Sequence, residues 1–179
     1  METTEKVVEA YVRYIKGWAT IPNIKCPGQL EIDLLAINPA TLERYHIETS
    51  VSISGGFSKL TNKPYSIEEA KERVKQAGQR RTLGFFIEKK FGSPAIGEML
   101  QMYGFKPGEY RKVIVSWGWD DDVPQEAGAH GIELWDFREI VKEIGSVSMA
   151  KSSYFTDDTL RTIQLFAKAL MEKKQAQKA

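Results

Sequence analysis

The sequence of 179 residues has one cysteine, two histidines and no long apolar run. Cys26, being single, forms no disulfide within the chain, which excludes a multi-cysteine zinc site and a secreted disulfide scaffold. Apolar runs such as residues 32–37 are far shorter than a membrane-spanning helix. The first residues contain neither a basic stretch nor an apolar stretch, so we expect no signal peptide and a reducing, cytoplasmic location.

A large net charge is also missing, because 25 Lys and Arg residues stand against 24 Asp and Glu residues. This balance argues against a protein that is strongly basic overall, yet the charges are unevenly distributed along the sequence. Residues 56–112 contain 12 basic and 6 acidic side chains, whereas residues 113–170 contain 5 and 10. A basic middle segment can contact phosphate groups; the alternative is a helix face that is merely solvated.

The apolar content is ample for a core, at 42% hydrophobic and 11% aromatic residues. Helical spacing is found over residues 5–16, 66–81, 83–104 and 156–174, and strand patterns over 18–21, 30–38, 44–54, 112–117 and 131–135. This order predicts an α/β domain with a mixed sheet flanked by helices, over residues 1–150, followed by a C-terminal helical extension over 151–179. Pro22 is expected to end the first strand.

Two acidic residues lie on neighbouring predicted strands, Asp33 on the first and Glu48 on the second. If these strands pair through the turn after residue 38, the two carboxylates come close on one surface, and Glu9 on the first helix can supply a third acid. Close carboxylates repel unless one is protonated or a cation lies between them, and Mg²⁺ and Mn²⁺ prefer oxygen ligands. The alternative is a solvated strand face. His46 shares the face of Glu48 and is expected to hydrogen-bond a neighbour rather than to bind metal.

Residues 28–37 (GQLEIDLLAI) and 45–50 (YHIETS) resemble the core of the PD-(D/E)xK nuclease superfamily. Residues 113–116 and 131–136, each followed by a helix, resemble the second half of that core, so the likeness spans about residues 5–145. The resemblance implies a restriction-endonuclease-like fold and metal-dependent hydrolysis of DNA. It also implies that Asp33 and Glu48 bind Mg²⁺ or Mn²⁺, with Glu9 in support.

The sequence departs from that family at Ser50, where the resemblance implies a lysine that orients the attacking water. A serine supplies no positive charge, so charge developing in the transition state is less well stabilised. Three explanations are open. A lysine can reach in from elsewhere, from Lys59 or from Lys71 or Lys75; the metal alone can suffice; or the chain is a catalytically inactive relative that still binds nucleic acid.

These observations favour a divalent-metal-dependent nuclease acting on DNA phosphodiesters, with no membrane partner. Lys59, which follows Gly55 and Gly56, is the favoured mobile cation because glycines let that loop bend. The residues expected to contact nucleic acid are Lys71, Lys75, Arg80 and Arg81. The first alternative is an inactive nucleic-acid-binding or assembly module on the same fold. The second is a protein-interaction domain whose C-terminal helix makes a homodimer.

Overall fold

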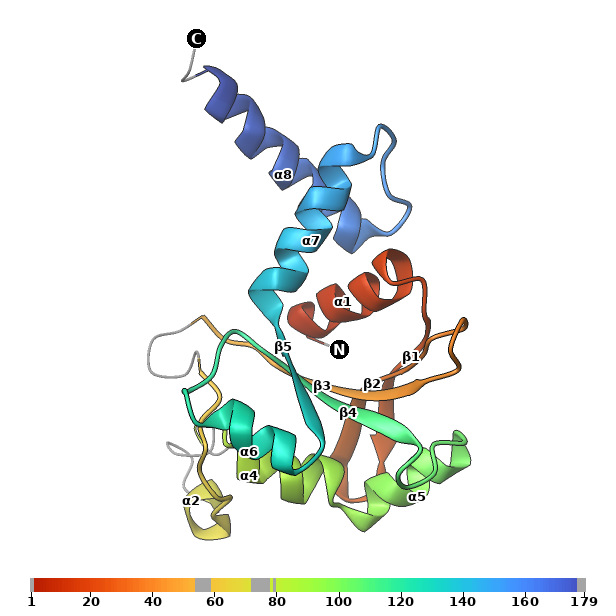
Figure 1. Cartoon of the computed structure of the whole chain (residues 1–179), viewed down its shortest axis with the longest axis vertical. Helices are drawn as coiled ribbons and strands as arrows, with labels where there is room; N and C mark the ends of the chain where they lie inside the picture. Colours follow the sequence, from red (N-terminus) through yellow and green to blue (C-terminus); the bar gives the residue numbers. More distant parts are fainter. Residues whose placement is uncertain (1, 54–58, 72–77, 79, 177–179) are drawn as a thin grey trace.

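The computed structural model describes residues 2–53, 59–71, 78 and 80–176 (Figure 1). Its described strands form one mixed sheet in the order β1-β2-β3-β4-β5. The strands are β1 (Ala19–Cys26), β2 (Leu30–Ile37), β3 (Arg44–Ser50), β4 (Tyr110–Ser116) and β5 (Ile132–Asp136). The first three strands pair antiparallel, whereas β4 and β5 extend the sheet in parallel. The predicted α/β class, a mixed sheet flanked by helices with a C-terminal helix, is confirmed.

Helices cover both faces of the sheet (Figure 1). One face carries α1 (Thr3–Ala10), which continues as the π-helical turn η1 (Tyr11–Ile15), together with α7 (Phe137–Ala150) and α8 (Asp158–Ala176). The other face carries α4 (Leu83–Phe85), the π-helical segment η3 (Phe86–Phe91), α5 (Pro94–Met102) and α6 (Val123–Ala129). The short elements α2 (Ile67–Lys71) and η2 (Pro27–Gln29) lie in the connections.

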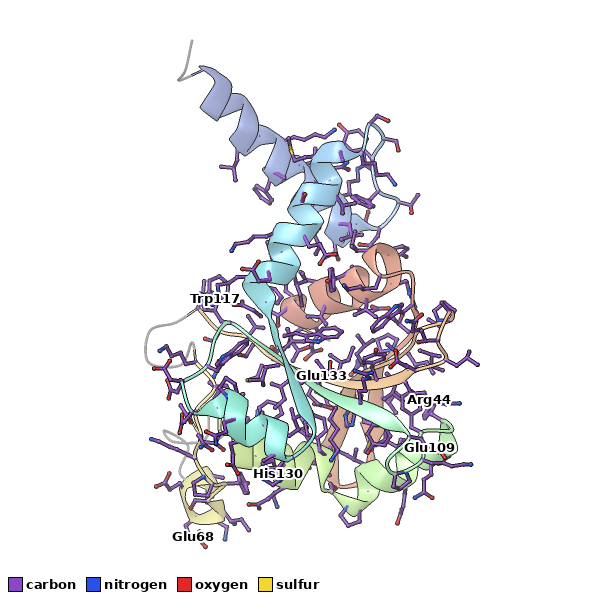
Figure 2. All side chains as sticks on the ribbon, viewed as in Figure 1. Arg44, Glu68, Glu109, Trp117, His130 and Glu133 are labelled. Atoms are coloured by element: carbon purple, nitrogen blue, oxygen red, sulfur yellow. The ribbon has the colours of Figure 1, made fainter. Side chains whose placement is uncertain are left out.

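Strand alternation divides the core between these two layers, and side chains fill both interfaces (Figure 2). Leu34 and Ile47 are buried with α1 and α7, whereas Leu35 is buried with α5. A third cluster joins Ile114 to α4 and α6. Each fully buried aliphatic side chain contributes about 1.5–3 kcal/mol. The same alternation turns the face of β3 that carries His46 toward η3 and α5.

The predicted end of the first strand was wrong. The first strand does not end at Pro22 but continues to Cys26, because β1 lies at the edge of the sheet, where a residue without an N–H is tolerated. The C-terminal segment packs on the layer of α1 and α7, because Leu160 of α8 is buried in the core with residues of those helices. Gln164 of α8 also donates hydrogen bonds to two backbone carbonyls that precede α8. Among the described residues, no helix has the length and apolarity to span a membrane.

Candidate functional site

The site begins where β2 and β3 separate. Their ladder ends at the pair Leu34 and Ile47, one step before Asp33 would face Glu48. The backbone N–H of Thr49 donates instead to Asp33 Oδ2, at 2.7 Å. A side-chain carboxylate therefore takes the place of a strand carbonyl as acceptor. The expected proximity of Asp33 and Glu48 is confirmed, because both contact one ammonium group.

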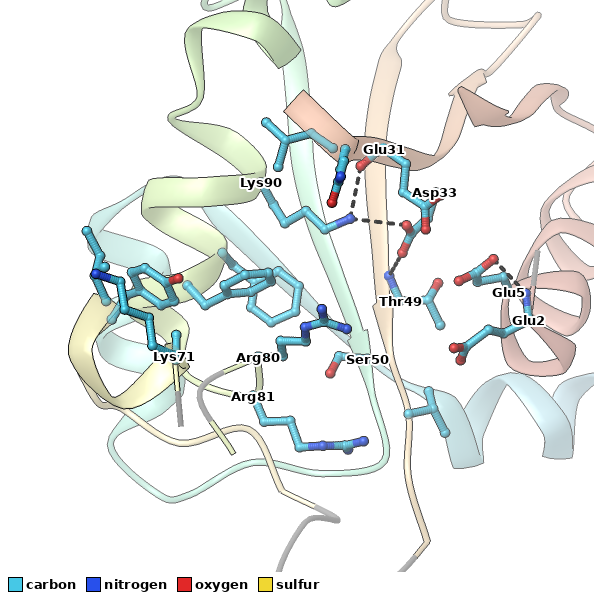
Figure 3. A pocket seen from close by; sticks show the side chains of 18 residues that line it. Glu2, Glu5, Glu31, Asp33, Thr49, Ser50, Lys71, Arg80, Arg81 and Lys90 are labelled. Atoms are coloured by element: carbon cyan, nitrogen blue, oxygen red, sulfur yellow. Dashed lines mark hydrogen bonds and ion pairs between the residues drawn. The ribbon is translucent and has the colours of Figure 1, made fainter. Parts of the chain in front are cut away.

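That ammonium belongs to Lys90 of η3 (Figure 3). Its Nζ lies 3.2 Å from Asp33 Oδ1 and 2.5 Å from Glu48 Oε2. It also donates to the backbone carbonyl of Glu31 at 2.9 Å. Phe86, four residues earlier, is buried against the sheet and holds η3 there, so Lys90 reaches between the strands. With its side chain 14% exposed, Lys90 is screened little by water.

Burial sets the charges of this cluster. It raises the pKa of Asp33 to about 7, a shift that the charge of Glu48 increases and that of Lys90 opposes. It raises the pKa of Glu48 to about 7 as well, again opposed by Lys90. Burial by itself lowers the pKa of Lys90, but the two carboxylates outweigh it, and the net pKa lies above its usual value. Strongly shifted pKa values at a pocket are frequent at functional sites, and buried structural ion-pair networks produce them as well.

The His46 side chain contacts Glu48. The ring is fully buried, and its Nε2 lies 2.7 Å from Glu48 Oε1. Burial lowers the pKa of His46 to about 3, with the charge of Lys90 adding to the effect, so the ring is neutral. Because the ring is neutral, its Nε2–H donates a hydrogen bond to Glu48 Oε1 when that carboxylate is ionised. The expectation that His46 hydrogen-bonds a neighbour is confirmed.

Two further carboxylates, those of Glu5 and Glu31, lie close to Asp33. Carboxylate oxygens of Glu5, Glu31 and Asp33 all lie within 4.8 Å of one another. Burial raises the pKa of Glu5, and the charge of Asp33 raises it further. Glu31 differs, since its hydrogen bond with Lys25 lowers its pKa. Three oxygen donors from α1 and β2 are a ligand set suited to Mg²⁺ or Mn²⁺.

These acids form one wall of a pocket of about 680 Å³. Figure 3 shows Arg80 and Arg81 reaching into it from the opposite side, near Ser50. The described residues that line it are Glu2, Glu5, Gln29, Leu30, Glu31, Asp33, Thr49, Ser50, Val51, Tyr65, Ile67, Ala70, Lys71, Arg80, Arg81, Phe85, Phe86 and Lys90. Glu48 is fully buried behind this lining. The pocket thus places an acidic wall opposite a basic wall.

Of the predicted site residues that the structure describes, all but two lie in or beside this pocket. Glu9 accepts from Thr20 at 3.3 Å and pairs with Arg13 at 3.2 Å, away from the described lining. Its place is taken by Glu5, one turn earlier on α1, because the N-terminal end of that helix is the end that reaches the pocket. Lys59 also lies elsewhere and pairs with Asp120 at 3.7 Å.

The basic residues expected to contact nucleic acid lie partly in the pocket and partly outside the described residues. Lys71, Arg80 and Arg81 line the pocket. Lys75 lies outside the described residues. Among the described residues, the ammonium group that contacts Asp33 and Glu48 belongs to Lys90, whereas Lys59 pairs with Asp120.

Sequence reasoning missed Lys90, Glu5 and Glu31. A usable signal existed for Lys90, because it stands four residues after Phe86 and next to Phe91, on the face of η3 that packs on the sheet. Glu5 shares a helix stripe with Glu9, so spacing indicates the face but not the depth along it.

No family model matches the chain, and no curated protein matches it. The chain is similar to a solved structure described as "Crystal Structure of Protein of Unknown Function AF1548", with 14% sequence identity over 97% of this chain and 96% of that chain, at a TM-score of 0.41. A likeness of this degree indicates no activity.

Proposed function

We propose that this chain is a divalent-metal-dependent nuclease that hydrolyses phosphodiester bonds of DNA. One observation carries the proposal: the half-buried Lys90 holds its ammonium between Asp33 and Glu48, in a pocket with an acidic and a basic wall. A phosphodiester requires a cation on its oxygens, an activated water and fixed positive charge around the reacting phosphate. Each requirement has a candidate group in this pocket.

Asp33 would hold Mg²⁺ or Mn²⁺ together with Glu5 and Glu31, whose oxygens converge on it. A divalent cation there supplies Lewis-acid chemistry and lowers the pKa of a bound water. The carboxylates need no large movement, because their oxygens already lie within 4.8 Å of one another. Burial raises the pKa of Glu5 and the charge of Asp33 raises it further, and a cation between the two carboxylates would relieve that repulsion.

Lys90 would take the role that the family resemblance gives to the position of Ser50. Its ammonium points at the carboxylate of Asp33 and would stabilise negative charge on a phosphate held there. Glu48 fixes this ammonium, and His46 fixes Glu48. The basic wall, formed by Lys71, Arg80 and Arg81, would bind neighbouring phosphates of the strand and make binding sensitive to salt.

A cleavage assay tests the proposal. Single-stranded, duplex and four-way-junction DNA are incubated with the protein in Mg²⁺ and separately in Mn²⁺. We expect cleavage by the wild type, none in EDTA and at least a hundredfold slower cleavage by Asp33→Asn and by Lys90→Met. Lys59→Met, a surface control, retains full activity. Absence of cleavage on every substrate, or equal cleavage by Asp33→Asn, contradicts the proposal.

The second candidate is a catalytically inactive module that binds nucleic acid. It is favoured by the same lysine, because the Lys90 ammonium already pairs with both carboxylates and compensates one of their two charges without a metal. In that case the basic wall binds DNA with a steep salt dependence, Mn²⁺ changes neither stability nor binding, and no cleavage occurs. The outcomes of the assay above and of a binding titration in salt therefore separate the two candidates.

A further inference from the structure

The proposed chemistry leaves the apolar part of the pocket unused. Metal binding needs the acids and phosphate binding needs the cations, yet Tyr65, Phe85 and Phe86 also line the cavity. The Tyr65 and Phe85 rings lie 5.7 Å apart with their planes at 52°. Phe86 is 2% exposed and belongs to the core, whereas Tyr65 and Phe85 are half-buried at the pocket surface. A phosphate gains nothing from aromatic walls, but a nucleobase does.

The chain holds Tyr65 in place by a close backbone approach. Gly84 N donates to Lys63 O at 3.0 Å, and a Cβ at Gly84 would lie 2.4 Å from Tyr65 N. A residue without a side chain is therefore required for this segment to lie against α4. The Lys89 ammonium lies over the Tyr65 ring, 5.0 Å from its centroid, and adds a cation–π contact. The aromatic wall is thus built by specific contacts.

We infer that the pocket takes an unpaired nucleotide of single-stranded DNA, with its base against Tyr65 and Phe85 and its phosphates between the basic and acidic walls. This inference rests on the proposed function and names its substrate. In a duplex the faces of a base are covered by its stacked neighbours, so an aromatic wall inside a pocket can meet a base only when the base is unstacked. At about 680 Å³, the cavity has room for a ligand well beyond a single phosphate.

The test compares binding of oligonucleotides that differ in their bases but not in their phosphates. Fluorescence anisotropy is measured in EDTA, where the proposed hydrolysis does not occur. The ligands are a short single-stranded DNA, the same strand with abasic nucleotides throughout, and the corresponding duplex. Stacking on an aromatic side chain changes affinity about 5- to 150-fold per base, so the wild type should bind the normal strand more tightly than the abasic strand by a factor in that range.

Variants assign this difference to the aromatic wall. Tyr65→Leu should bind the normal strand as weakly as the abasic one, whereas Tyr65→Phe retains the ring and should behave as wild type. Tyr14→Leu, at an exposed tyrosine of η1 outside the described lining, is the matched control and should change nothing. The abasic comparison uses wild-type protein, so the test does not depend on how any variant folds.

Equal affinity for the normal and abasic strands, or tighter binding of the duplex, overturns the inference. If cleavage still requires Asp33 in that event, the nuclease proposal stands and the base site is wrong. If the protein binds none of the three ligands, the inference falls, and the cleavage assay in Mg²⁺ and Mn²⁺ decides the nuclease proposal by itself.

Discussion

Replacing Lys90 by methionine tests the electrostatics of the site. The change keeps much of the side-chain volume but removes the charge between Asp33 and Glu48. Removing one partner of a buried ion pair costs about 3–5 kcal/mol, since the other charge is left uncompensated. For a chain of this size, that loss lowers the Tm by about 6–20 °C. Lys59→Met, which removes an exposed pair with Asp120, should cost about 0–1 kcal/mol.

The loss of stability in Lys90→Met must depend on pH in a defined direction. The folded pKa values of Asp33 and Glu48 are raised to about 7, above their ordinary values of 3.8 and 4.5. Groups shifted in this direction favour folding at acidic pH, and that contribution disappears as the pH rises through the folded pKa. Without Lys90 both values rise further. The gap in stability between wild type and Lys90→Met should therefore be larger at about pH 8 than at about pH 5.

The assay is thermal unfolding followed by circular dichroism at both pH values, with EDTA and with Mn²⁺. At the higher pH, Mn²⁺ should raise the Tm of Lys90→Met more than that of the wild type, because the cation replaces the missing positive charge. An equal Tm loss at both pH values would refute the reasoning, because the effect would then come from packing. A Lys90→Met variant that is as stable as Lys59→Met at about pH 8 would refute it too.

Three further predictions concern the neighbouring groups. Metal binding displaces protons from the buried carboxyls, so the stabilisation by Mn²⁺ should be greater at about pH 8 than at about pH 6; equal Tm shifts would count against it. Glu5→Gln should weaken Mn²⁺ binding about tenfold in a calorimetric titration, whereas Glu9→Gln, one turn along the same helix, should leave it unchanged. Gly84→Ala should lower stability by about 1–3 kcal/mol in denaturant titrations, because the new Cβ meets the backbone of Tyr65, whereas Gly97→Ala, with open space around it inside α5, should be neutral or stabilising.

The sequence predicted the frame of the site because strand registers follow from short-range patterns. Alternation placed Asp33 and Glu48 on adjoining strands, and the pairing of β2 with β3 confirms it. The choice of lysine did not follow in the same way. Lys90 lies 57 positions after Asp33 in the chain and reaches it through the packing of η3 on the sheet, and only the folded structure fixes that approach. Pro22 was misread for a related reason, because the position of β1 at the edge is a property of the whole sheet.

The proposed nuclease requires a divalent cation at Asp33. The most direct test is the anomalous scattering of manganese in crystals soaked with Mn²⁺ at about pH 8. The proposal predicts a strong peak within about 2.3 Å of an Asp33 oxygen, shared with Glu5 or Glu31, and its loss in Asp33→Asn. The absence of a manganese peak at these carboxylates after soaking, or the same peak in the variant, would contradict it.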